Sequence, residues 1–149
     1  MENILFNLGL VLLLVAVNGY FVAAEFSLVS IRTTRIDQLV EEGNAIARFI
    51  QKSKQDPSRF LSASQTGITL ASLALGWVGE PTVAEIVLAA FAKVHLDFNL
   101  VIIHSIATVI AFILITYMHI VLGELLPKAL ALQRTEPTVL LTAWPMKFL

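Results

Sequence analysis

The chain has 149 residues, of which 57% are hydrophobic and 14% are charged, and its formal net charge is −1. Soluble globular domains average about 25% charged residues, so this composition indicates a single membrane domain and provides no basic surface for nucleic acid. The absence of cysteine excludes a disulfide framework, a thiolate metal site and a cysteine nucleophile.

The first apolar segment, residues 4–30, is longer than the ~20 residues that a helix needs to cross a hydrocarbon core. No basic residue precedes it, so we expect a retained membrane span rather than a cleaved signal peptide. Asn18, Val22 and Glu25 share one helical face at spacings of four and three. Interhelical hydrogen bonding is the simpler role for Asn18. A carboxylate such as Glu25 is costly inside a span, which favours a functional role.

Residues 32–59 contain six of the ten basic residues of the chain, namely Arg32, Arg35, Arg48, Lys52, Lys54 and Arg59. The positive-inside rule therefore places this connection in the cytoplasm and the N-terminus outside. Apolar residues recur at helical spacing on both sides of Gly43 and Asn44, which predicts two short amphipathic helices along the inner surface. The basic residues set the topology or, alternatively, hold anionic lipid.

A helix start at Asp56 and Pro57 leads into the second predicted span, residues 60–79. One face of this span is a polar stripe formed by Ser62, Gln65, Thr69, Ser72 and Gly76. A second face consists of small residues suited to close helix contact, namely Ala63, Gly67, Ala71 and Ala74. We expect a turn at residues 79–81, followed by a re-entrant or interfacial helix over residues 83–96, which is too short to span the membrane.

The third predicted span covers residues 100–122 and is introduced by residues 97–99. Thr108 and His119 face the same way, because eleven residues make close to three helical turns. Neither His104 nor His119 has a second histidine four residues later, so a helical zinc site is not indicated. We expect both histidines to be buried and hydrogen-bonded.

The stretch that closes this span, residues 119–128, carries a carboxylate, a proline and an ammonium group. Pro127 has no N–H, so in an α-helix the carbonyl of Gly123 loses its partner beside Glu124. Such a carbonyl needs a partner in protein, water or an ion, and hard cations such as Mg²⁺ and Na⁺ prefer oxygen ligands. The alternative is a kinked helix end in which Glu124 pairs with Lys128.

Residues 135–145 predict a further helix in the inner interface, and Arg134 and Lys147 on either side of it again mark the cytoplasm. Because the sequence ends on an apolar stretch, we expect more protein to follow residue 149.

The predicted topology brings polar groups from three separate spans to a similar depth in the cytoplasmic half of the membrane. These groups are the side chains of Glu25, Gln65, Thr69 and Glu124. Residues that serve only in packing have no reason to share a depth, so the pattern favours an oxygen-lined, inward-facing cavity. Two carboxylates with hydroxyls and a freed carbonyl suit a hard cation.

Three stretches of the chain resemble the CorB/CorC and cyclin-M (CNNM) magnesium transport family. They are residues 18–30 (NGYFVAAEFSLVS), 64–81 (SQTGITLASLALGWVGEP) and 119–128 (HIVLGELLPK). The resemblance covers residues 1–149 as a transmembrane module. It implies a homodimer in the plasma (inner) membrane, with three spans and an interfacial helix per subunit, an extracellular N-terminus and cytoplasmic CBS domains downstream. It also implies that Mg²⁺ is exported in exchange for Na⁺.

The ion site of that family, carried over residue by residue, falls on Asn18, Glu25, Gly67, Thr69, Ser72 and Glu124. The carbonyl of Gly123 adds a further candidate ligand. Val22 and Ala23 stand where several relatives have Ser-Gly. Our leading hypothesis is a Mg²⁺ transporter, and the alternative is a Mg²⁺-sensing membrane anchor without transport. An enzyme is not favoured, because the sequence indicates neither a Ser–His pair nor a metalloprotease helix.

Overall fold

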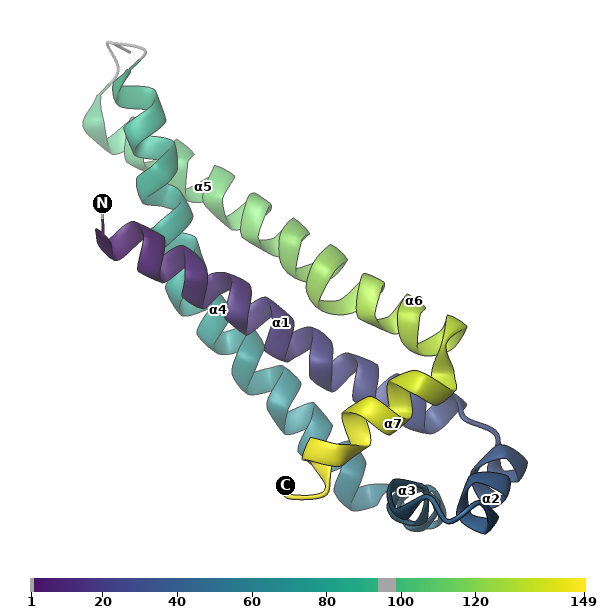
Figure 1. Cartoon of the computed structure of the whole chain (residues 1–149). Helices are drawn as coiled ribbons and strands as arrows, with labels where there is room; N and C mark the ends of the chain where they lie inside the picture. The colour runs from purple at the N-terminus through teal and green to yellow at the C-terminus, as the bar shows by residue number, and fades with distance from the viewer. Residues whose placement is uncertain (1, 94–98) are drawn as a thin grey trace.

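The computed structural model describes residues 2–93 and 99–149, and every regular element within these ranges is helical (Figure 1). In chain order the elements are α1 (Glu2–Ser30), α2 (Thr33–Glu41), α3 (Ala45–Gln55), α4 (Ser58–Ala92), α5 (Leu100–Met118), the π-helix η1 (His119–Leu125), α6 (Leu126–Gln133) and α7 (Thr135–Met146). Three helices are long and apolar enough to cross a membrane. The predicted all-α membrane fold with three spans and shorter helices is confirmed.

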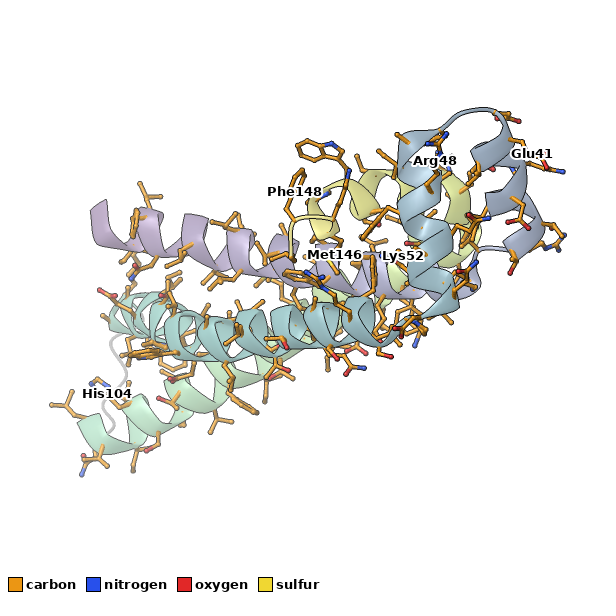
Figure 2. The ribbon with its side chains drawn as sticks, turned by 90° about the horizontal axis from the view of Figure 1, so that it is seen from below. Glu41, Arg48, Lys52, His104, Met146 and Phe148 are labelled. Atoms are coloured by element: carbon orange, nitrogen blue, oxygen red, sulfur yellow. The ribbon has the colours of Figure 1, made fainter. Side chains whose placement is uncertain are left out.

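The three spanning helices are Ile4–Ser30 of α1, Ser58–Ala92, and the continuous helix Leu100–Gln133 formed by α5, η1 and α6. The first packs against α4, η1 and α6, and α4 also packs against α5. In Figure 1 the C-terminal part of α4 and the start of α5 run beyond the N-terminus of α1 and form what we call the hairpin end. The opposite end holds α2, α3 and α7, and we call it the basic end. Figure 2 shows His104 at the hairpin end and Glu41, Arg48 and Lys52 at the basic end.

The two short helices of the basic end are separated by a glycine in the left-handed region. Gly43 has a φ of 86°, which L side chains rarely adopt, and Asn44 then caps α3 by accepting two backbone N–H groups. Lys54 of α3 donates to the carbonyls of Leu28 and Val29 at 3.0 and 2.6 Å, which ties α3 to the end of α1. The predicted pair of short helices is confirmed.

The turn predicted at residues 79–81 is wrong, because α4 continues through Pro81. A proline removes one i→i−4 hydrogen bond, but spanning helices tolerate it where neighbouring helices pack closely. A Cβ on Gly79 would lie 3.0 Å from Ile115 Cδ1, so α4 and α5 are in close contact at this level. The separate helix predicted over 83–96 is therefore the continuation of α4, and its last residues lie outside the described part of the chain.

Large apolar side chains are exposed along the spanning helices, as a membrane requires. On α4 the exposed fractions are 62% for Leu70, 68% for Leu73 and 85% for Trp77. The structure leaves these residues on the outside of the bundle. In a bilayer this surface contacts hydrocarbon.

Candidate cation site

A cavity of about 280 Å³ lies between α1, α4 and η1, in the half of the bundle nearer the basic end, and we call it the central cavity. Five of the seven predicted metal-site residues line it, namely Asn18, Glu25, Thr69, Ser72 and Glu124. Segments far apart in the sequence thus bring both predicted carboxylates to one cavity. The other two, Gly67 and Gly123, are not among the lining residues.

The central cavity has an open mouth and a closed floor. Its exposed lining residues are Gln65, Thr69 and Glu124, whereas Asn18 is only 2% exposed. Glu25 lies half-buried between these levels, where one carboxylate oxygen accepts the hydroxyl of Ser64 at 3.2 Å. Carboxylate oxygens therefore occur near the mouth, and amide and hydroxyl groups form the floor.

The alternative pairing of Glu124 with Lys128 does not occur in this structure. The ion pairs among the described residues are made by Arg35 with acidic side chains. Lys128 Nζ instead lies 4.4 Å from the centroid of the Phe26 ring, a cation–π arrangement. The Glu124 carboxylate is consequently not neutralised by the lysine one turn away.

A chain of three hydrogen bonds forms the floor, and together they determine which group donates the proton in each bond. Asn18 Nδ2 lies 2.9 Å from the carbonyl oxygen of Gly123, which only accepts, so the amide nitrogen must face it. Asn18 Oδ1 then accepts the hydroxyl proton of Ser72 at 3.2 Å. Because that hydroxyl has a single proton, the contact of 3.2 Å between Ser72 and His119 is an Nε2–H donating to Oγ. The carbonyl of Gly123, four residues before Pro127, thus accepts a hydrogen bond from Asn18 of α1.

The π-helix η1 places His119 and Glu124 on the same cavity. Residues five apart in an α-helix point about 140° away from each other. In η1 the backbone bonds span five residues, as when Leu126 N–H donates to the Val121 carbonyl, and the wider turn brings the two side chains together. In place of a kinked helix end, one of the two alternatives for this stretch, the chain forms a π-turn, a feature often found at functional sites.

Glycines allow the close approach of the helices around the cavity. A Cβ on Gly67 would overlap the ring of Phe21, and a Cβ on Gly19 would lie 2.8 Å from the Pro127 ring. A Cβ on Gly123 would come within 2.9 Å of His119. The predicted small face of α4 is confirmed as a contact face, since Ala71 is also buried.

Sequence reasoning missed His119 as a residue of the cavity, because it was expected only as a hydrogen-bonded side chain, which it is. Gln65 was expected to line the cavity and does so, although it is not among the predicted ion ligands. The expectation that His104 is buried is wrong, because it is exposed. No sequence signal reveals the role of His119, since its approach to Glu124 depends on the π-turn.

The expectation that the chain has no Ser–His pair is corrected by the contact between Ser72 and His119. The proton order of the floor nevertheless gives this histidine the donor role, so it is not poised to accept the serine proton as a general base would. Nothing in this arrangement activates Ser72 as a nucleophile.

The ligand set suits a hard cation held by few charges. In the described ranges no group of three His, Cys, Asp or Glu side chains is placed to hold a metal ion. The central cavity instead combines two carboxylates with neutral oxygens from Asn18, Thr69 and Ser72. Fewer charged ligands mean weaker and more readily reversible binding.

Comparison with known proteins gives one consistent result. Residues 8–149 match the family described as CNNM, cyclin M transmembrane N-terminal domain. The chain is 43% identical to UPF0053 protein YrkA and 41% identical to UPF0053 protein YhdP of Bacillus subtilis, each over 140 residues. It is 40% identical over 134 residues to UPF0053 protein sll0260 of Synechocystis. These alignments cover 94%, 94% and 87% of the chain but only 32%, 31% and 29% of the relatives. The chain therefore spans about a third of their length.

Proposed function

Since this chain belongs to the CNNM (cyclin M) transmembrane-domain family, we propose that it transports Mg²⁺ through the central cavity, exporting the ion from the cytoplasm in exchange for Na⁺. The observation that carries the proposal is the convergence of Glu25 and Glu124, 99 positions apart in the sequence, on one oxygen-lined cavity within a membrane bundle. Carboxylates inside a membrane are costly and favour an ion-handling role.

In the proposed site, Glu124 and Glu25 provide the charge, and Asn18, Thr69 and Ser72 provide neutral oxygens. Thr69 donates its proton to the Gln65 carbonyl, and Ser72 donates its proton to Asn18. Each hydroxyl oxygen therefore keeps a lone pair on the side away from these acceptors, where it can bind a cation. Gly123 takes part through its carbonyl, which holds the Asn18 amide and so orients Oδ1. Gly67 contributes the space that Phe21 fills.

The proposal includes an orientation and partners. The basic end faces the cytoplasm and the N-terminus faces outward across the plasma (inner) membrane, in accordance with the positive-inside rule. Two copies form a homodimer embedded in lipid, and CBS domains follow residue 149 in the cytoplasm. The greater length of the relatives supports the downstream region.

The test is the replacement Glu124→Gln in proteoliposomes that contain a Mg²⁺-sensitive dye. It removes one of the two charges of the site, so we expect the initial rate of Na⁺-driven Mg²⁺ flux to fall by about 10- to 100-fold. Glu85→Gln is the matched control, because Glu85 is an exposed carboxylate of α4 that does not line this cavity. Equal flux in the two variants would refute the assignment of the site.

Mg²⁺-dependent thermal stabilisation separates transport from sensing. A ligand that binds only the folded chain raises its unfolding temperature, and the rise is larger for tighter binding at a given ligand concentration. Stabilisation of the unsubstituted chain by Mg²⁺ together with zero flux would select the alternative function, a Mg²⁺-sensing membrane anchor.

A further inference from the structure

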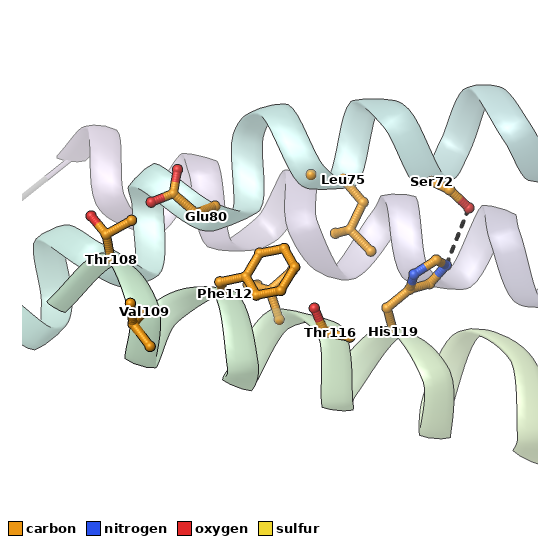
Figure 3. A pocket seen from close by; sticks show the side chains of 10 residues that line it. Ser72, Leu75, Glu80, Thr108, Val109, Phe112, Thr116 and His119 are labelled. Carbon is orange, nitrogen blue, oxygen red and sulfur yellow. Dashed lines mark hydrogen bonds between the residues drawn. The ribbon is translucent and has the colours of Figure 1, made fainter. Parts of the chain in front are cut away.

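Two cavities of the bundle meet at one pair of side chains. Besides the central cavity, a hollow of about 690 Å³ lies between α4 and α5, and we call it the α4–α5 groove. Ser72 and His119 line both spaces, and their hydrogen bond of 3.2 Å forms the shared wall between them (Figure 3). The groove therefore begins where the central cavity ends.

The groove is polar at its two ends and apolar in the middle. Figure 3 shows the Glu80 carboxylate and the Thr108 hydroxyl at the end away from the shared wall, with Leu75 and Phe112 between. Glu80 lies eight residues beyond Ser72 on α4, which corresponds to about 12 Å along the helix. The groove thus extends the central cavity toward the hairpin end and has a carboxylate near its far end.

Glu80 is half-buried, and it forms no ion pair with any side chain in the described part of the chain. Among the described residues the ion pairs are those that Arg35 makes with Glu42 and Glu136. A carboxylate inside a membrane needs a compensating charge, and a cation supplies one. One carboxylate and a few hydroxyls in 690 Å³ are too few to replace a hydration shell, which Mg²⁺ gives up reluctantly. The ligand class that fits the groove is a hydrated cation.

We infer that the α4–α5 groove is the half of the cation path that opens at the hairpin end. A hydrated cation is held at Glu80, and it exchanges with the central cavity when Leu75 and Phe112 move apart and the shared wall opens. In this structure, the apolar middle of the groove and the shared wall separate Glu80 from the central cavity. This inference rests on the proposed transport function and adds the second half of its path.

Gly76 provides a steric test that leaves every polar group in place. It lines the groove, and a Cβ built on it meets no atom within 4 Å, so the Cβ of Gly76→Leu enters open space. Leucine is also a better helix former than glycine. We expect Gly76→Leu to lower Mg²⁺ flux by roughly tenfold or more, since an apolar plug blocks a hydrated ion.

Gly9→Leu is the matched control, because Gly9 of α1 is exposed and also has no atom within 4 Å of a built Cβ. Its flux is expected to stay within about twofold of the unsubstituted chain. Mg²⁺-dependent thermal stabilisation should persist in both variants, because the central cavity is intact. Equal flux in Gly76→Leu and Gly9→Leu would overturn the groove as a path.

A flux-independent measurement uses the absence of native cysteine. In Thr108→Cys the single thiol lies beside Glu80, so a cationic methanethiosulfonate reagent should react about tenfold faster than an anionic one. Glu80→Gln should remove this preference, and His104→Cys, exposed on α5 outside the groove lining, should show little of it.

The two measurements separate the groove from the transport function. If the thiol of Thr108→Cys showed no preference for the cationic reagent while Mg²⁺ flux in the unsubstituted chain was normal, the groove would be overturned as a cation path and the proposed function would stand. A preserved charge preference without flux in the unsubstituted chain would overturn the proposed function and leave a hydrated-cation site at Glu80.

Discussion

At the scale of single residues, Gly67 is a predicted site residue whose role is either a contact of its backbone or the small size of its side chain. A Cβ there would overlap the ring of Phe21, which stands edge-on to Tyr20 with the ring centroids 5.2 Å apart. We therefore expect Gly67→Ala to lower the free energy of unfolding by about 1–3 kcal/mol, as overpacking generally does. Denaturation of the purified protein in micelles measures this loss.

The second variant of this test is Phe21→Leu, which removes the ring that the new methyl group would meet. In the double variant the loss caused by Gly67→Ala should shrink, giving a coupling energy of about 0.5–3 kcal/mol in a double-mutant cycle. Additive effects would contradict the steric explanation and favour a direct role of the Gly67 backbone.

The kind of group at the site was predictable from the sequence, whereas its exact partners were not. Asn18 was expected to bond another helix or an ion, and it links the Gly123 carbonyl to Ser72. Glu25 and Glu124 were expected at one depth because charge inside a span is rare and the topology fixes its level. The place of His119 beside Glu124 follows from backbone bonding in η1, which no α-helical periodicity contains.

At the scale of elements, the errors of prediction arise where tertiary contacts override local signals. Pro81 is a strong local breaker, but α4 passes through it because α5 packs against Gly79. A kinked helix end at Pro127 was one of two alternatives left open, and the chain instead widens into a π-turn before α6. The Gly43 break was predicted correctly because it depends only on glycine and the following cap.

The contact between α2 and α7 gives a pH-dependent prediction. Arg35 donates from Nε and Nη2 to both carboxylate oxygens of Glu136, at 2.8 and 2.9 Å. This hydrogen bonding, with the charge of Arg35, lowers the pKa of Glu136 below its ordinary value of 4.5. A lowered folded-state pKa means that the stabilisation is complete above 4.5 and is lost as the pH falls through the folded-state pKa.

We therefore expect the thermal unfolding temperature to decrease below pH 4.5 more in the unsubstituted chain than in Glu136→Gln. The difference is expected to be small, because both side chains are partly exposed and water screens the pair. Asp56, whose pKa is lowered by its hydrogen bonds with Ser58, continues to titrate in both proteins and provides the common background. Identical pH profiles would show that the α2–α7 contact does not contribute to stability.

At the scale of the whole molecule, polar groups are ordered along the bundle axis while the outer surface stays apolar. The central cavity opens at Gln65 and Glu124, its floor is Asn18, and the α4–α5 groove continues from there to Glu80. Hydropathy predicted the three spans because length and composition suffice for that. The division of the polar path into two spaces was not predictable, since it depends on one contact between α4 and η1.

The orientation of the bundle across the membrane is a further prediction. Because the chain has no native cysteine, a single introduced cysteine can be labelled selectively to measure it. Glu41 and His104 are both exposed, and Figure 2 shows them at opposite ends of the molecule. In right-side-out membrane vesicles, an impermeant maleimide should label His104→Cys at once and Glu41→Cys only after permeabilisation. The reason is that basic residues near the ends of spans stay in the cytoplasm, and acidic residues contribute little, so Glu41→Cys leaves the determinants of topology intact. The reverse labelling pattern would turn the central cavity outward and would require Mg²⁺ to enter the cavity from outside the cell.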